Sequence, residues 1–271
     1  IHSKLCLLHK LDPIKLSDFG ECPYDHGGYF IIKGKEKIIL SQEKKVNNIL
    51  YINKSPDDMI LLQGNIKSIS NEGLQSSRTN VVSLIQHKLP VSEKQKRKEY
   101  TLVVRILGID IQVPLFILFR ALGFETDKEI LPFLLYSTDS QELTQTLIHL
   151  IQPSIKNSQP VYSQTSALKL LSLNTKGKEI FNVLDILNNN LFPNYGSDFR
   201  QKAHYLGYVS RQILLTHIGL LKQTDRDSYS FKRVDLSGNL ILELYRELWG
   251  NFKRNTSRKL DDEYKIIQII N

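Results

Sequence analysis

Hydrophobic and polar residues alternate through the first part of the chain, a pattern that is typical of β-strands. The clearest example is a pair of apolar runs, 29–32 and 37–41, that flank a turn at Gly34-Lys35. Glycine adopts a positive φ at no steric cost, so this pattern predicts a β-hairpin. Further strands are predicted at 46–52, 59–63, 65–69, 79–87 and 100–106.

From Pro114 onward the apolar residues recur at helical spacing. Thr126, followed by acidic residues, predicts the N-cap of a helix that ends near Tyr136, and Pro132 would kink or delay that helix. Strands followed by helices predict an α+β fold. The other predicted helices cover 115–122, 140–150, 164–171, 178–191, 199–221 and 235–252, and a helical pattern recurs over 258–270.

Composition and charge narrow the class of protein. The 271 residues suffice for one large or two ordinary domains, and a hydrophobic content of 41% suffices for a buried core. No apolar run approaches the ~20 residues that span a bilayer, and the first residues lack the pattern of a signal peptide. The only cysteines, Cys6 and Cys22, favour a reducing compartment. The formal net charge of +8 is consistent with a polyanionic partner.

The chain shows no recognisable catalytic set. It contains no Gly-rich phosphate-binding loop, no Gly-x-Ser-x-Gly and no paired-carboxylate motif suited to two metal ions. The chain opens on Ile1 and its only methionine is Met59, so we expect it to be a piece of a longer protein. We expect no catalytic residues in it.

A charged segment between two predicted helices is the best candidate for a site. It contains Arg226 and Asp227 and, after a short polar stretch, Lys232 and Arg233. Alternating charges before a helix usually form local ion pairs, and Asp235 is placed to cap the helix that follows. The same cations would also suit phosphate groups. For Lys232 and Arg233 the sequence leaves both interpretations open.

A zinc site is a second possibility that the sequence raises. Cys6-x2-His9 and Cys22-x3-His26 have the ligand types and local spacings of a Cys2His2 site. A free buried cysteine behaves as a small hydrophobic residue, and we favour that interpretation here. We therefore predict no bound metal.

Two further basic groups are interpreted as solvated surface. Lys33, Lys35 and Lys37 surround the hairpin turn, and alternation predicts that all three share one strand face. The basic run 92–98 is predicted to be a hairpin tip. Any phosphate contact by these lysines would be weakened by salt.

Four strings of residues resemble the second-largest subunit of multisubunit DNA-directed RNA polymerases of the eukaryotic, archaeal or large-DNA-virus type. The most specific are Cys-Pro-Tyr-Asp-His-Gly-Gly-Tyr-Phe-Ile-Ile-Lys-Gly-Lys-Glu-Lys at 22–37 and Asp-Arg-Asp-Ser-Tyr-Ser-Phe-Lys-Arg-Val-Asp-Leu at 225–236. The others lie at 114–123 with 129–131 and at 202–208. All four occur in the order found in that family.

The resemblance implies an architecture and a role. It implies a two-part protrusion, a β-hairpin and sheet at 1–58 with helices at 231–271, around an inserted mixed α/β lobe at 59–230. In that family this region forms a wall of the DNA cleft and a docking surface for transcription factors. In that family the string at 225–236 borders the nucleic-acid channel. The resemblance therefore implies phosphate contacts for Lys232 and Arg233. It also implies a base-edge contact for Asp227, with Arg226 next to it in the same nucleic-acid site.

The resemblance also implies partners and a location. The partners would be other polymerase subunits, including the largest, the template and non-template DNA strands, and initiation and elongation factors, with no membrane. The catalytic magnesium would be bound mainly by the largest subunit, so this chain alone would be inert and hold no cofactor. The location would be the nucleus of a eukaryote, or the virion or viral factory of a virus. The alternative is a free-standing basic protein-interaction module without nucleic-acid contact.

Overall fold

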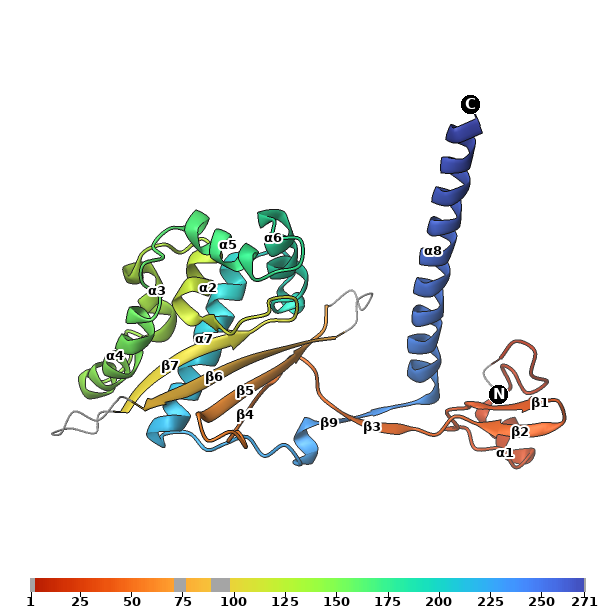
Figure 1. Ribbon diagram of the computed structural model, residues 1–271. Helices are drawn as coiled ribbons and strands as arrows, with labels where there is room; N and C mark the ends of the chain where they lie inside the picture. Colours follow the sequence, from red (N-terminus) through yellow and green to blue (C-terminus); the bar gives the residue numbers. More distant parts are fainter. Residues whose placement is uncertain (1–2, 71–76, 89–97, 271) are drawn as a thin grey trace. The chain divides into compact units, whose positions relative to one another are not determined.

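The computed structural model describes residues 3–70, 77–88 and 98–270 (Figure 1). Contacts divide the chain into two compact units. We call Asn47–Ser228 the inserted unit, and Ile1–Val46 together with Tyr229–Asn271 the split unit. The described residues mix helices with antiparallel sheets, which confirms the predicted α+β class. The protrusion and lobe architecture stays a prediction.

The inserted unit is built on an antiparallel sheet with the strand order β4-β5-β6-β7-β8. Alternate side chains of its central strands, such as Val82, Leu84 and Val104, are fully buried and form one side of the core. The strands span Leu50–Asn53 (β4), Ile60–Ser68 (β5), Arg78–Lys88 (β6), Lys98–Arg105 (β7) and Val113–Pro114 (β8).

Helices pack on this sheet and on one another. In the view of Figure 1, α7 runs behind β5 and β6, and α4 packs on β7. Every residue of α2 is buried, so this short helix lies at the centre of the core. The bounds are Leu115–Ala121 (α2), Asp127–Leu134 (α3), Gln141–Lys156 (α4), Gln164–Leu173 (α5), Ile180–Asn189 (α6) and Phe199–Ile218 (α7), with a 3-10 turn at Pro193–Tyr195.

The predicted start of α3 is confirmed. The Thr126 side chain accepts a hydrogen bond from the Glu129 amide, as an N-cap residue does. Pro132 lies inside the helix, which nevertheless continues to Leu134. A proline in the interior removes one backbone donor, and the helix ends within its next turn.

β5 is one continuous strand where the sequence predicted two, 59–63 and 65–69. Gly64 interrupts the run of β-forming side chains but not the ladders with β4 and β6. A Cβ atom added to Gly64 would lie 2.9 Å from Ile213 and 3.0 Å from Leu50. The glycine therefore marks a close approach of α7 to the sheet, not the end of a strand.

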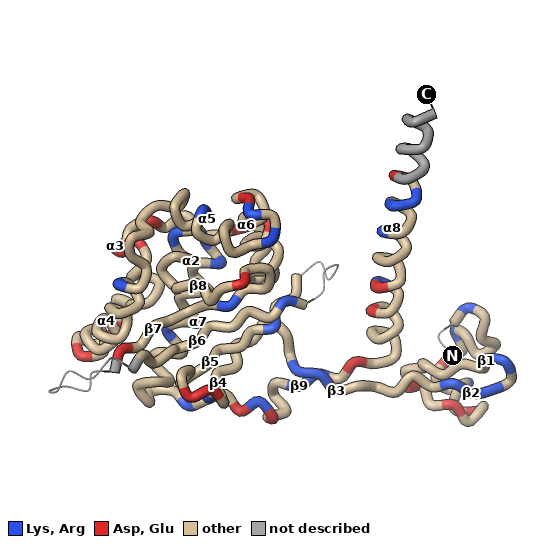
Figure 2. Tube along the Cα trace, viewed as in Figure 1, with Lys and Arg blue, Asp and Glu red and all other residues tan. Residues whose placement is uncertain are grey.

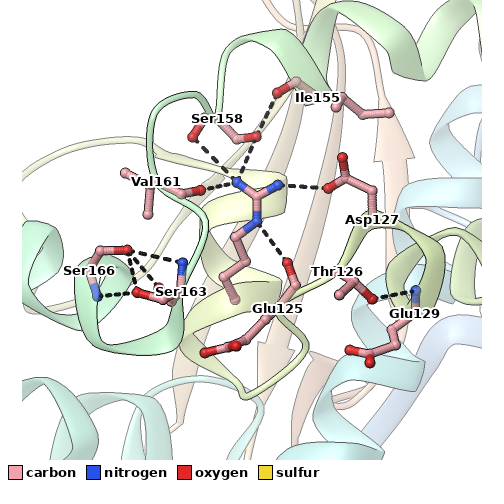
Figure 3. Close-up of polar contacts among 10 residues, drawn as sticks. Glu125, Thr126, Asp127, Glu129, Ile155, Ser158, Val161, Ser163 and Ser166 are labelled. Atoms are coloured by element: carbon pink, nitrogen blue, oxygen red, sulfur yellow. Dashed lines mark hydrogen bonds and ion pairs between the residues drawn. The ribbon is translucent and has the colours of Figure 1, made fainter.

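Arg120 is a buried cation of the inserted unit, and Figure 3 shows residues that accept its hydrogen bonds, among them Asp127, Ser158 and Val161. It lies in α2 and is 1% exposed, and its buried guanidinium has several hydrogen-bond acceptors around it. It donates to the carbonyls of Glu125 (3.3 Å), Ser158 (3.4 Å) and Val161, and forms an ion pair with Asp127 at 2.7 Å. A buried cation with these partners fixes the start of α3 and the 155–161 turn against α2.

A second buried cation joins α7 to the segment that follows α3. Arg211 donates to both carboxylate oxygens of Asp139, at 2.8 and 2.6 Å, and to the carbonyl of Leu134 at 3.0 Å. Its guanidinium also lies over the ring of Tyr136, 4.2 Å from the centroid. Both charged side chains of this ion pair are only 7% exposed.

The split unit contains a short helix α1 (Pro13–Asp18), the hairpin β1 (Tyr29–Ile32) and β2 (Lys35–Ile38), a ladder of β3 (Gln42–Lys45) with β9 (Lys232–Asp235), and the long helix α8 (Ser237–Ile270). A 3-10 turn at Tyr229–Phe231 precedes β9. α8 is continuous where the sequence predicted separate helical segments at 235–252 and 258–270. The large apolar residues Leu244, Leu248 and Phe252 of α8 are exposed.

The hairpin is confirmed, but its turn lies one residue earlier than predicted. Ile32 pairs with Lys35, so the turn is Lys33-Gly34 and not Gly34-Lys35. Both turn residues have a positive φ, 52° and 73°, as a two-residue type I′ turn requires. Residue 33 is therefore in the turn, and only Lys35 and Lys37 share a face of β2.

The units meet along the sequence at 46/47 and 228/229, whereas the predicted domain divisions are 58/59 and 230/231. Residues 47–58 go with the inserted unit because β4 pairs with β5 along its whole length. The names protrusion and lobe remain predictions for these segments.

Replacing Asp139 by Asn should lower the free energy of unfolding by about 3–5 kcal/mol, because the buried Arg211 guanidinium would lose its counter-charge. Arg211 holds the pKa of Asp139 below its usual value. The ion pair therefore stabilises the fold above about pH 4, and that contribution is lost as pH falls through the lowered pKa. Urea unfolding between neutral and acid pH, followed by circular dichroism, measures both effects.

The matched control for this prediction is Asp110→Asn, which changes an exposed carboxylate that has no side-chain partner among the described residues. Equal midpoints of urea unfolding for the two variants would contradict the role assigned to Asp139.

Candidate nucleic-acid interface

The ladder between β3 and β9 carries two of the residues predicted to meet nucleic acid. Its register places Lys44 opposite Arg233 and Lys45 opposite Lys232, so two pairs of cations face each other directly. Like charges at such positions repel. The ladder therefore needs compensating negative charge.

Two carboxylates supply part of that charge along diagonals of the ladder. Lys232 forms an ion pair with Glu43 at 2.8 Å on one face, and Lys44 forms one with Asp235 at 2.5 Å on the other. Asp235 is buried, and it raises the pKa of Lys44 by accepting a hydrogen bond from its ammonium group. The sequence did not reveal these partners, because Glu43 and Lys44 lie almost 190 residues before β9.

Arg233 is exposed and differs from Lys232 in its partners. Its guanidinium donates to the carbonyls of Ser230 (3.2 Å) and Lys232 (2.7 Å). Among the residues that the structure describes, it has no carboxylate partner. Figure 2 shows the Lys and Arg positions of this ladder together on β3 and β9.

Arg226 and Asp227, the other two predicted residues, belong to the inserted unit. Both are exposed, and the Asp227 amide donates to the Asp225 carboxylate at 3.0 Å, which makes a tight local turn. Lys232 and Arg233 belong to the split unit, so the four predicted residues form two pairs that we treat separately.

The prediction that Asp235 caps the next helix is wrong. Asp235 is the last residue of β9, and α8 begins at Ser237, so Leu236 occupies the position before the helix. The carboxylate is instead used by Lys44.

The remaining predicted groups are the two Cys-His pairs and the basic run 92–98. Cys6 and Cys22 are free cysteines, but Cys6 is only half-buried and Cys22 is exposed, so the interpretation of Cys22 as a buried hydrophobic residue is wrong. In the described part of the chain no group of three His, Cys, Asp or Glu side chains is suited to a metal. The prediction for His9 and His26 therefore stays a prediction. Of the basic run 92–98, residues 92–97 lie outside the described residues, and Lys98 is the first residue of β7.

The string 202–208, which carries part of the resemblance, contains both buried and exposed residues. Lys202 is fully buried in α7 and donates to the carbonyls of Leu187 (2.8 Å) and Asn188 (2.6 Å) at the end of α6. Burial lowers its pKa to about 8. A Cβ atom on Gly207 would lie 2.5 Å from the Phe133 carbonyl oxygen, so α3 and α7 approach closely there. Lys202 and Gly207 are therefore scaffold residues, whereas His204 and Tyr208 of the same string are exposed.

The chain is similar to known proteins along nearly its whole length. The chain matches the model of the family described as RNA polymerase beta subunit over residues 1–267. It is 32% identical to DNA-directed RNA polymerase II subunit RPB2 of Encephalitozoon cuniculi, over 96% of this chain and 22% of that protein. It is 32% identical to DNA-directed RNA polymerase II subunit 2 of Arabidopsis thaliana, over 94% of this chain and 22% of that protein.

The similarity extends to another polymerase class. The chain is 28% identical to DNA-directed RNA polymerase III subunit 2 of Arabidopsis thaliana, over 96% of this chain. The matched segment spans about a fifth of each of these relatives. The chain belongs to the RNA polymerase beta subunit family, as the matching strings at 22–37 and 225–236 indicated.

Asp235→Asn should weaken the β3–β9 ladder by about 1 kcal/mol, a value reduced to allow for solvent screening at Lys44, whose side chain is 40% exposed. Backbone amides of β3 and β9 should then exchange about fivefold faster with deuterium. Because Asp235 raises the pKa of Lys44, the contribution is complete below the ordinary lysine value and is lost as pH rises through the raised pKa.

The control is Glu243→Gln, which removes the longer, exposed contact of Lys44 at 3.5 Å. If both variants leave the exchange rates of the ladder unchanged, Asp235 does not hold β3 to β9.

Proposed function

We propose that this chain is part of the second-largest subunit of a DNA-directed RNA polymerase, where it forms part of a wall of the DNA cleft and offers a docking surface to transcription factors. Family membership over residues 1–267 and the names of the relatives support the polymerase role. The chain spans about a fifth of those relatives, so the activity of the whole protein is part of the proposal.

The observation that carries the DNA-contact part is the unbalanced charge of the β3–β9 ladder. Four cations lie on adjacent rungs, and the carboxylates within the two strands are those of Glu43 and Asp235. Phosphate groups alongside the ladder would relieve the remaining repulsion. In this proposal Arg233 contacts phosphate with its exposed guanidinium, and Lys232 adds to the local positive potential.

Arg226 and Asp227 have separate roles in the proposal. Arg226 is exposed in a turn and would contact the DNA backbone, whereas the Asp227 carboxylate would accept a hydrogen bond from a base amino group. The Asp225–Asp227 turn supports this by holding the backbone of the segment.

The partners and location follow from the same family. The partners would be the largest subunit and other polymerase subunits, both DNA strands, and initiation and elongation factors. The relatives described above are named as subunits of RNA polymerases II and III, and from this we propose a nuclear location. None of them is viral. Among the described residues no helix is long and apolar enough to cross a membrane.

Lys232→Ala with Arg233→Ala, introduced into the assembled polymerase, should weaken DNA retention and flatten its salt dependence. Each lost phosphate contact should reduce the slope of log K against log salt by about 0.9 for duplex DNA, or about 0.7 for a single strand. Arg233→Ala alone should show the effect without breaking the Lys232–Glu43 ion pair. Fluorescence anisotropy of labelled DNA across a salt series measures the slope.

The matched control is Lys169→Ala with Lys176→Ala, two exposed lysines of the inserted unit. Exposed charges contribute only about 0–1 kcal/mol to stability, so both double variants should fold. If the Lys232/Arg233 variant unfolds while DNA binding keeps its salt slope, the charges serve only the ladder, and the rival of a basic protein-interaction module without DNA contact gains support.

The purified chain should not incorporate nucleotides when supplied with magnesium, template and nucleoside triphosphates. Nucleotidyl transfer needs metal-bound carboxylates, which we expect mainly on the largest subunit. The assay is template-dependent incorporation of a labelled nucleotide, with intact polymerase as the positive control. Synthesis that stays with this chain through successive purification steps would refute this expectation.

A further inference from the structure

A half-open pocket of about 370 Å³ lies at the free edge of the sheet of the inserted unit. It is bounded by the start of β4, by one face of α7 and by the segment 221–224. Tyr205, Tyr208, Gln212 and Thr216 supply the α7 face, because residues spaced by three or four positions lie on one side of a helix. We call this the β4-edge pocket.

The pocket lies beside backbone groups of β4 that point away from the sheet. At Ile52 the outer edge is occupied, since its amide donates to the Thr224 hydroxyl (3.1 Å) and its carbonyl accepts from the Thr224 amide (3.0 Å). In an antiparallel pair, residues two apart direct their N–H and C=O to the same edge. The N–H and C=O of Leu50 therefore point to the outer edge as well, beyond the reach of Thr224.

Several side chains around the pocket can donate hydrogen bonds. The Oδ1 atom of Asn48 accepts from the Ile69 amide (2.9 Å), which leaves its Nδ2 group to donate. Tyr205 and Tyr208 bring phenol hydroxyl groups, which can donate hydrogen bonds. Lys222 is exposed at the rim and adds a positive charge. An occupant with negatively charged or acceptor oxygens would complement this lining.

We propose that the β4-edge pocket binds a short extended segment of a partner protein, paired with Leu50 through its backbone and placing an Asp or Glu side chain near Lys222. A backbone N–H and C=O pair at a strand edge matches the groups of an extended peptide, as in strand addition. A nucleic acid has no such alternating N–H and C=O groups along its backbone, so the outward pair of Leu50 favours a peptide.

This inference rests on the factor-docking part of the proposed function and names one site for it. It does not depend on DNA contact by the β3–β9 ladder. Failure to bind peptide leaves the salt-slope experiment unaffected, so the two proposals fail separately.

The test is a selection of random short peptides displayed on phage against the whole immobilised chain, followed by fluorescence anisotropy with one synthetic enriched peptide. Enriched sequences should share an acidic residue at a fixed position. Replacing that residue by its amide should weaken binding, and Lys222→Glu in the protein should weaken it about tenfold or more. Lys169→Glu, an exposed lysine away from the pocket, is the matched control and should bind normally.

A second variant tests the backbone contact. Leu50→Pro removes the outward N–H without removing a bond to β5, and proline is tolerated at an edge position of this kind. Because the Leu50 side chain packs on the core, Leu50→Ala is the control for its loss, and Leu50→Pro should bind the peptide more weakly than Leu50→Ala does. If Leu50→Pro unfolds the protein, Lys222→Glu alone decides the outcome.

Three results would overturn the proposal. The first is enrichment of peptides without an acidic residue, and the second is binding that is insensitive to Lys222→Glu. The third is Lys222-dependent binding of labelled oligothymidylate that the enriched peptide cannot displace, which would assign the pocket to nucleic acid.

Discussion

Buried cations that donate to backbone carbonyls are the interactions on which the inserted unit depends. Arg120, Lys202 and Arg211 are each almost fully buried, and each donates to at least one carbonyl near the end of a helix or in a turn. Such carbonyls lack intrahelical partners and would be costly to bury alone. A long cationic side chain donates to such carbonyls and so offsets the cost of burying them. Because its own helix fixes the position of its donor groups, the side chain also fixes where the next element begins.

One resemblance string can combine core residues with residues that line a surface pocket, as Tyr205 and Tyr208 do. The string at 202–208 contains a lysine, a histidine and two tyrosines, a composition that would suit a binding surface. In the structure its lysine is a core residue and its glycine is the point where α3 meets α7. The chemistry of a motif is therefore read correctly only when the burial of each member is known.

Local patterns were sufficient to predict much of the fold. The hairpin, the Thr126 cap and most helices follow from residue periodicity and from side chains that bond neighbouring backbone groups. The sequence could not predict the β3–β9 ladder, because Gln42–Lys45 is as polar as a loop and its partner is almost 190 residues away. The same distance hid the role of Asp235, which looked like a helix cap until Lys44 was placed beside it.

The candidate site was predicted only in part for the same physical reason. Lys232 and Arg233 could be recognised as candidates from charge, but their ion-pair partners and the repulsion across the rungs depend on register. Register in a short polar ladder is set by diagonal charge pairs, since no buried apolar face fixes it. The β4-edge pocket had no signal in the sequence, as its lining comes from three separate stretches of chain.

The bond between the Val46 amide and the Phe231 carbonyl (3.0 Å) has a consequence for how this chain can change over time. It joins the two points of the split unit between which the inserted unit departs and returns. When the two ends of an inserted segment are held together, the entropic cost of closing that loop grows only logarithmically with the length of the segment. The inserted unit can therefore gain, lose or exchange segments in evolution at little thermodynamic cost to the ladder, which makes it a natural place for lineage-specific variation.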